Sequence, residues 1–135
     1  MEYRIAKYSD YEMLQEWWKF WRFPIPPIVT LPQEDDENFS GLIVYENRKD
    51  IACGFLYKTN SALCWLEYIV TNPNTSSEER NLGIKTVIEQ LSIKAKELGY
   101  KAIFSSIKNE NLINKYKNSG FIEGSKGTTE MIKIF

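Results

Sequence analysis

Three apolar segments separated by very short polar connections constrain the fold of this chain most strongly. Residues Leu42–Glu46, Ile51–Lys58 and Leu63–Val70 have the composition of strands, and only the turn-rich stretches Asn47–Asp50 and Thr59–Ser61 separate them. Connections this short join antiparallel neighbours, because a parallel crossover needs a dozen or more residues. The centre of the chain is therefore predicted to be an antiparallel meander.

The segments on either side of the meander predict helices and further strands. A capping box at Ser9 and Glu12 predicts a helix that runs to about Trp21. Apolar residues at helical spacing predict a second helix that runs from about Ile84 to Leu98. The remaining elements are a strand at 3–7, a strand at 102–107, a short helix at 109–118 and a last strand at 128–135.

The predicted order is β-α-β-β-β-α-β-α-β, and it describes one mixed α/β (α+β) domain over residues 1–135. The sheet is expected to be mostly antiparallel and flanked by helices. The helix at 84–98 connects two strands as a crossover, so this pair of strands should be parallel.

The absence of histidine removes a large part of enzyme chemistry. No Ser-His-Asp or Cys-His nucleophile, His-ligated zinc or imidazole proton shuttle can be built. Cys53 and Cys64 are too few for a four-ligand zinc site, no metal is expected, and both are expected to be reduced core residues.

Charge is nearly balanced overall but unevenly distributed. The net charge of -1 gives no reason to expect a nucleic-acid partner. Residues 1–79 hold 7 basic and 13 acidic side chains, whereas residues 80–135 hold 10 basic and 5 acidic ones. The cationic second part suits a small polyanionic ligand, although solvated lysines on helix faces explain it equally well.

No secretory or membrane-spanning segment is expected. The first residues carry no apolar signal core, and the most apolar stretch, 23–32, is interrupted by prolines and is short for a bilayer. The chain is thus expected to be cytoplasmic and to have no membrane partner. The sequence leaves the oligomeric state open, a homodimer included.

A first candidate site lies where the polar loop 71–81 is expected to enter the second helix. A glycine at such a junction lets a ligand approach the backbone, and the free N–H groups of a helix start favour phosphate. The junction has neither a Walker A loop nor a dinucleotide fingerprint, and an ordinary helix start is an equal alternative. Its residues are Arg80, Asn81, Leu82, Gly83, Ile84 and Lys85.

Two motifs resemble those of the GNAT superfamily of acyl-CoA-dependent N-acyltransferases. Arg80, Gly83 and the position of Lys85 are similar to the family's pyrophosphate-loop pattern Arg/Gln-x-x-Gly-x-Gly/Ala, although Lys85 replaces a small residue. The family's pattern Asn-x6-Tyr-x3-Gly-Phe is matched by Asn109, Tyr116, Gly120 and Phe121. The predicted order of strands and helices is also that of the family.

The resemblance implies transfer of an acetyl group from acetyl-CoA to a primary amine. The thioester would lie in a split between the strand that ends near Thr71 and the strand at 102–107. Glu67 would accept the amine's proton, directly or through water, and Tyr116 would protonate the departing thiolate. An exposed strand carboxylate and a packed helix aromatic are the structural alternatives for these two residues.

The resemblance also implies a set of donor contacts. Backbone groups of Ile69, Val70 and Thr71 would bind the pantetheine arm and the acyl carbonyl. Residues 80–85 would hold the pyrophosphate, and Asn109 would contact CoA in addition to capping its helix, with capping alone an equal alternative.

The acceptor is expected to be a small amine or a peptide N-terminus. Trp17, Trp18, Trp21 and Phe23 are expected to form an aromatic wall that binds it. The acidic run 34–37 could attract a cationic amine. An aromatic core with a solvated acidic loop remains the simpler interpretation.

Two other functions remain open at this stage. The lysine at position 85 raises the alternative of a GNAT-like module that binds CoA or another ligand without turnover. The aromatic and proline-rich face raises the alternative of a peptide-interaction domain.

Overall fold

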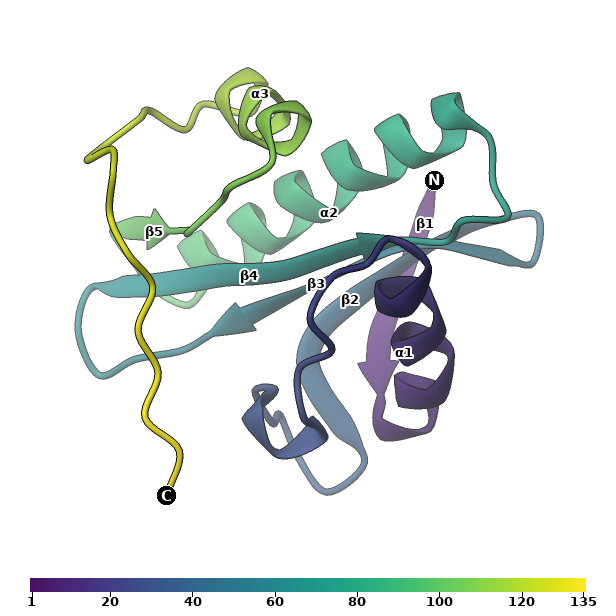
Figure 1. The fold of residues 1–135 in the computed structure, drawn as a ribbon, viewed down its shortest axis with the longest axis horizontal. Helices are drawn as coiled ribbons and strands as arrows, with labels where there is room; N and C mark the ends of the chain where they lie inside the picture. The colour runs from purple at the N-terminus through teal and green to yellow at the C-terminus, as the bar shows by residue number, and fades with distance from the viewer.

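A five-stranded sheet lies at the centre of the computed structural model, which describes residues 1–135 (Figure 1). The strands are neighbours in chain order; the first three pairs are antiparallel, and β4 and β5 are parallel. Their bounds are β1 Glu2–Lys7, β2 Asn38–Glu46, β3 Lys49–Tyr57, β4 Leu63–Thr71 and β5 Ala102–Phe104. The expected mixed, mostly antiparallel sheet is confirmed.

A two-residue turn joins β2 to β3 and fixes their register. Glu46 pairs with Lys49, and the two residues between them, Asn47 and Arg48, have φ angles of 50° and 63°. Two successive positive φ angles are typical of a type I′ turn, whose twist matches that of the flanking strands. The predicted meander is confirmed, with β2 beginning at Asn38 rather than at Leu42.

Helices cover both faces of the sheet. Helix α1 (Tyr11–Phe20) lies on one face, and α2 (Ser77–Glu97) runs along the other with α3 (Glu110–Asn118) beside it (Figure 1). Each face has its own buried cluster, one around Trp18 and Phe55 and the other around Leu66 and Leu91. Two 3₁₀ turns, Tyr8–Asp10 and Ile28–Thr30, complete the elements. None of the helices combines the length and apolar character needed to cross a membrane.

The entry to α1 differs from the expected capping box. Ser9 lies within the first 3₁₀ turn, and Asp10 is the residue that precedes the helix. The Asp10 carboxylate accepts the Lys7 N–H at 2.7 Å and two N–H groups of the Arg4 guanidinium at 2.8 and 2.9 Å. Asp10, rather than Ser9 with Glu12, therefore stabilises the start of α1 and connects it to β1.

Helix α2 begins earlier than the sequence predicts. Its N-cap is Ser76, which forms a capping box with Glu79, and the helix is continuous from Ser77. The expected loop-to-helix junction at residues 80–85 is therefore wrong, because these residues already lie in the first turns of the helix.

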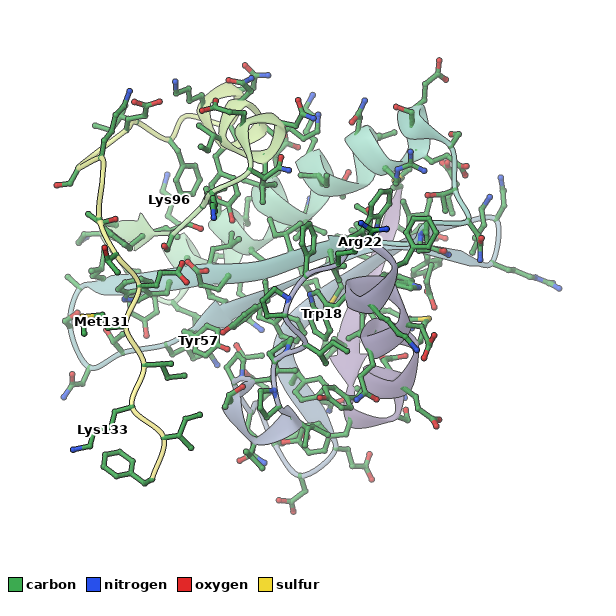
Figure 2. All side chains as sticks on the ribbon, in the orientation of Figure 1. Trp18, Arg22, Tyr57, Lys96, Met131 and Lys133 are labelled. Carbon is green, nitrogen blue, oxygen red and sulfur yellow. The ribbon has the colours of Figure 1, made fainter.

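The predicted last strand at 128–135 is also wrong, because this segment pairs with no other strand. Figure 2 shows Met131 and Lys133 on the terminal segment, away from the helices. A hydrogen bond from the Ser106 hydroxyl to the Glu130 carboxylate, 2.9 Å long, ties the segment to the residues after β5. Its apolar side chains are at least 83% exposed: Met131, Ile132, Ile134 and Phe135.

Gly83 allows α2 to pack closely on the sheet. A Cβ atom at this position would lie 2.8 Å from Ile51 Cγ2 and 3.1 Å from Ala52 Cβ, both on β3. Both atoms are attached close to the backbone of β3, so they cannot move away by a change of rotamer. The glycine is therefore required for the close packing of α2 on β3.

Gly83→Ala should lower the free energy of unfolding by about 1–3 kcal/mol, because the added methyl overpacks the interface with β3. Urea unfolding monitored by circular dichroism measures this change. Gly124→Ala is the matched control, since a Cβ there meets no atom within 4 Å. Equal stability of the two variants would contradict the packing role of Gly83.

Removal of residues 128–135 should change the free energy of unfolding by less than about 1 kcal/mol, because their backbone pairs with no strand and their side chains are exposed. Urea unfolding of the truncated chain tests this expectation. A much larger loss would mean that the segment packs against the sheet in solution.

Candidate functional site

Strands β4 and β5 separate after only three paired positions. Leu63, Cys64 and Trp65 pair with residues 102–104. Beyond Trp65, the edge of β4 that faces β5 pairs with no strand up to Thr71, where β4 ends. The split expected from the sequence is therefore present. Beyond the last pair, the Ser105 hydroxyl donates a hydrogen bond to the Leu66 carbonyl at 2.6 Å and bridges the base of the split.

A bulge in β4 lies beside this split. The register between β3 and β4 shifts between the pairs Phe55–Glu67 and Cys53–Val70, and Tyr68 has a φ of 58°. A positive φ is costly for a bulky residue and is maintained only where the surrounding packing imposes it. The Tyr68 ring packs edge-on against Trp18, with ring centroids 6.5 Å apart. Bulges re-aim the side chains next to them.

Glu67 directs its carboxylate towards the residues that follow β5. Leu66 belongs to the cluster under α2, so strand alternation places Glu67 on the α1 face. The Glu67 carboxylate accepts the Ser106 backbone N–H at 2.5 Å. Burial raises the pKa of the carboxyl above its ordinary value, although the Ser106 hydrogen bond opposes this shift. A half-buried carboxyl with a raised pKa can act as a proton acceptor.

Tyr116 brings a hydroxyl to the same split from α3. The residue is 3% exposed, and its hydroxyl lies 3.1 Å from Ser105 Oγ and 3.5 Å from the Leu66 carbonyl oxygen. Burial raises the pKa of the phenol above its usual range, so the hydroxyl stays protonated. Asn109 caps this helix by accepting the Leu112 N–H at 3.1 Å, which confirms its capping role.

Glu67 and Tyr116 are thus brought together, one on each face of the sheet, with Ser105 and Ser106 between them. Sequence reasoning missed both serines. The signal that could have found them is a pair of small hydroxyl residues directly after a short strand, where a strand separates from its neighbour.

The end of β4 is tied to the end of α1. The Trp21 indole N–H donates to the Thr71 carbonyl at 2.9 Å. The carbonyl of Thr71, one of the three residues whose backbone groups are expected to bind the donor, is therefore already engaged. Ile69 contributes its side chain to the cluster under α2, and Val70 contributes its side chain to the cluster under α1.

The residues expected to cradle a pyrophosphate do not form a loop. The Arg80 guanidinium donates to the Thr75 carbonyl and lies over the Trp21 ring, 5.4 Å from its centroid. Gly83 faces β3, and Ile84 is half-buried. Asn81, Leu82 and Lys85 are exposed on α2. A diphosphate therefore does not fit these residues as a backbone cradle.

The expected aromatic wall is divided between the core and the surface. Trp18 is 1% exposed and stacks on Phe55 at 6.2 Å, so it cannot contact a substrate (Figure 2). Trp17 is also buried, Trp21 is half-buried, and Phe23 is 41% exposed. The four residues are not one binding surface, because a helix that packs on a sheet buries its central aromatics first.

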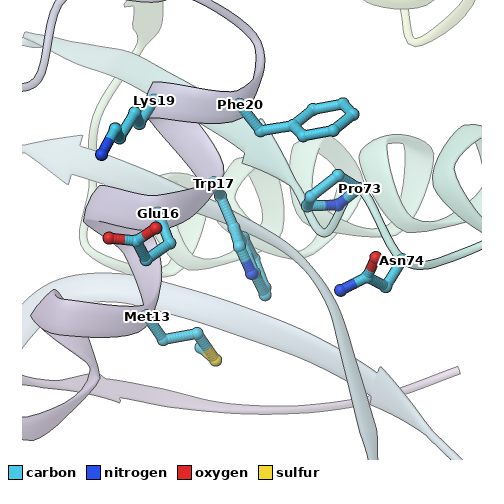
Figure 3. A pocket seen from close by; sticks show the side chains of 7 residues that line it. All are labelled: Met13, Glu16, Trp17, Lys19, Phe20, Pro73 and Asn74. Atoms are coloured by element: carbon cyan, nitrogen blue, oxygen red, sulfur yellow. The ribbon is translucent and has the colours of Figure 1, made fainter.

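A groove with a volume of about 620 Å³ lies between α1 and the loop that leads to α2 (Figure 3). In Figure 3, Trp17 and Phe20 extend from α1 towards Pro73 and Asn74 on the opposite side. Met13, Glu16 and Lys19 complete the lining. Neither catalytic candidate lines this groove, so it is distinct from the split.

The acidic run is partly used within the protein. Glu34 forms an ion pair with Lys58 at 2.6 Å. Asp35 accepts the backbone N–H groups of Glu37 and Asn38 and so shapes its own loop. Only Glu34 in this run has a cationic partner, and Asp35, Asp36 and Glu37 are exposed.

No protein-family model and no curated protein matches the sequence. Solved structures match at low identity. A probable acetyltransferase is 15% identical with a TM-score of 0.72, over 100% of this chain and 99% of that one. The ribosomal-protein-S18-alanine N-acetyltransferase from Escherichia coli is 16% identical with a TM-score of 0.76, over 92% and 79%. Rv2747 from Mycobacterium tuberculosis, in complex with CoA, is 16% identical with a TM-score of 0.65, over 95% and 76%. These likenesses confirm the expected fold.

Trp18→Ala should lower the free energy of unfolding by about 3–5 kcal/mol, because it empties a core position. Phe23→Ala is the control and should lower the free energy of unfolding by no more than about 1 kcal/mol, because its side chain is 41% exposed. Urea unfolding of both variants measures the difference. Similar small losses in both would contradict the core position of Trp18.

Proposed function

Because the chain has the fold of GNAT acetyltransferases, we propose that it is an N-acetyltransferase that moves an acetyl group from acetyl-CoA to a primary amine. The observation that carries the proposal is the split between β4 and β5, with the Glu67 carboxylate and the Tyr116 hydroxyl on its two faces. A proton acceptor and a proton donor on opposite faces suit a transfer in which one proton leaves the acceptor and another reaches the leaving group.

The proposed chemistry assigns one proton to each of these groups. A bound acetyl thioester supplies an activated carbonyl carbon. Glu67 takes the proton that the amine loses as its nitrogen bonds to that carbon, directly or through one water. Tyr116 gives its proton to the sulfur as the carbon–sulfur bond breaks. The β4 backbone at 69–71 offers N–H groups to the carbonyl oxygen as this atom gains negative charge.

The surroundings of Glu67 support an amine as the acceptor. The rings of Tyr57 and Tyr68 lie 6.3 Å apart on the same face, and Tyr68 is 42% exposed. Glu130, which is bonded to Ser106, adds a second negative charge near the Glu67 carboxylate. Aromatic rings and two carboxylates favour a cationic ammonium group, either of a small molecule or of a peptide N-terminus.

A binding module without turnover is the second candidate, and the start of α2 favours it. This helix start is capped by the side chains of Ser76 and Glu79 and lacks the expected glycine loop. Weak binding of the acyl donor would reduce turnover even with Glu67 and Tyr116 in place.

Incubation of the purified chain with acetyl-CoA and a panel of primary amines tests the proposal. Release of free thiol gives the rate, and mass spectrometry of the amine gives the product. Both cysteines of the chain are buried, so the background reaction with a thiol reagent should be low. Thiol release without an acetylated amine, or no release at all, would contradict the proposed transfer.

The pH dependence of kcat/KM should identify Glu67 as the base. Burial raises the pKa of this carboxyl above its ordinary value of 4.5. The acidic limb of the profile, along which kcat/KM increases with pH, should therefore have an apparent pKa above 4.5. Glu67→Gln should lower kcat about 10²- to 10⁴-fold and remove the limb.

Tyr116→Phe is the matched comparison, because it removes the proposed acid and leaves the base. It should lower kcat and retain the acidic limb. A Glu67→Gln variant that keeps the same limb would show that another group accepts the proton.

A further inference from the structure

The N-terminus of α2 satisfies its own hydrogen bonds. The Ser76 hydroxyl accepts the Glu79 N–H at 3.1 Å, and the Glu79 carboxylate accepts the Ser76 N–H at 2.9 Å. The Arg80 N–H already donates to the Ser76 carbonyl at 3.0 Å, as in regular helix. Only the amides of Ser77 and Glu78 are left at the helix start, which is too few for a diphosphate cradle.

Acidic side chains of the chain itself already occupy the positive end of this helix. Glu78 and Glu79 both lie in the first turn, where their carboxylates complement the positive end of the helix dipole. The pKa of Glu79 is lowered by its hydrogen bonds to Ser76 and Lys49, so this carboxylate stays ionised. A diphosphate brought to the same turn would compete with these carboxylates for the positive end of the helix.

The nearest cations balance the formal charge of these two carboxylates, but groups of this chain already engage them. Lys49 is paired with Glu79 at 3.3 Å. Arg80 donates to the Thr75 carbonyl and stacks on Trp21. Lys85 lies farther along the helix, exposed and 4.0 Å from Glu89. The features that would hold the phosphates of CoA are thus used for helix capping, loop closure and packing.

We infer that this chain recognises its acyl donor through the thioester and the uncharged arm next to it, and that the nucleotide diphosphate adds little to binding. The inference rests on the proposed function, because it takes the split between β4 and β5 as the thioester site. The substrate class is then acyl thioesters of pantetheine or of shorter thiols, with acetyl-CoA as one member.

Calorimetric titration of the full chain with acetyl-CoA and with S-acetylpantetheine, without an amine, tests the inference without relying on turnover. The two dissociation constants should agree within about threefold, and that of acetyl-CoA should change little as ionic strength rises. Binding of acetyl-CoA about 100-fold tighter than that of S-acetylpantetheine would overturn the inference. Absence of binding by both compounds would overturn it as well.

Kinetics with acetyl-CoA and S-acetylpantetheine separate this inference from the proposed function. With the best amine of the panel, the two donors should give kcat/KM values within about threefold of each other. A large preference for acetyl-CoA would overturn the inference and leave the proposed function standing. Transfer from neither donor would overturn the proposed function, and the ratio of binding constants would still decide the inference.

A double variant tests the physical cause. Glu78→Gln with Glu79→Gln removes both charges and preserves the capping box, since glutamine also forms it. This variant should bind CoA about threefold to tenfold more tightly than the unmodified chain and bind pantetheine equally well. Glu89→Gln with Glu97→Gln, away from the helix start on the same helix, is the control and should change neither affinity. Unchanged CoA affinity in the folded first variant would overturn the electrostatic basis of the inference.

Discussion

The unequal pairing of β4 is the constraint on which the site depends. One edge of this strand is bonded to β3 over most of its length, and the other edge is bonded to β5 at three positions. A strand held firmly on one side cannot bend to follow a neighbour that departs on the other. The separation of the two strands is therefore part of the fold, and Ser105 bridges its base by bonding to the Leu66 carbonyl.

Local patterns predicted the parts of the molecule that local interactions determine. Short connections predicted the meander, and helical spacing predicted most of α2. The hydroxyl of Tyr116 at the split was expected from the resemblance to a family motif, not from a local pattern. The bulge at Tyr68 could not be predicted, because no glycine marks it and the packing of Trp18 and Tyr57 around that ring maintains it. Ser105 and Ser106 were missed because their roles come from strand separation, which is a tertiary property.

Two predictions were wrong because one residue pattern serves two physical purposes. A glycine early in a helix favours close approach of a ligand or of a strand, and only the position of β3 shows that Gly83 does the latter. The capping box at Ser76, which moves the helix start ahead of the motif, was present in the sequence and was overlooked. The alternation at 128–135 is typical of a strand, but an extended segment becomes a strand only when a neighbour bonds to it.

Trp21 touches three parts of the molecule that are distant in sequence. It ends α1, donates to the last residue of β4, and stacks under Arg80 near the start of α2. An outward tilt of α1 would have to break this hydrogen bond and separate the stacked guanidinium. The end of α1 is thereby mechanically coupled to the far end of the split, so any rearrangement that widens the space beside one would displace the other.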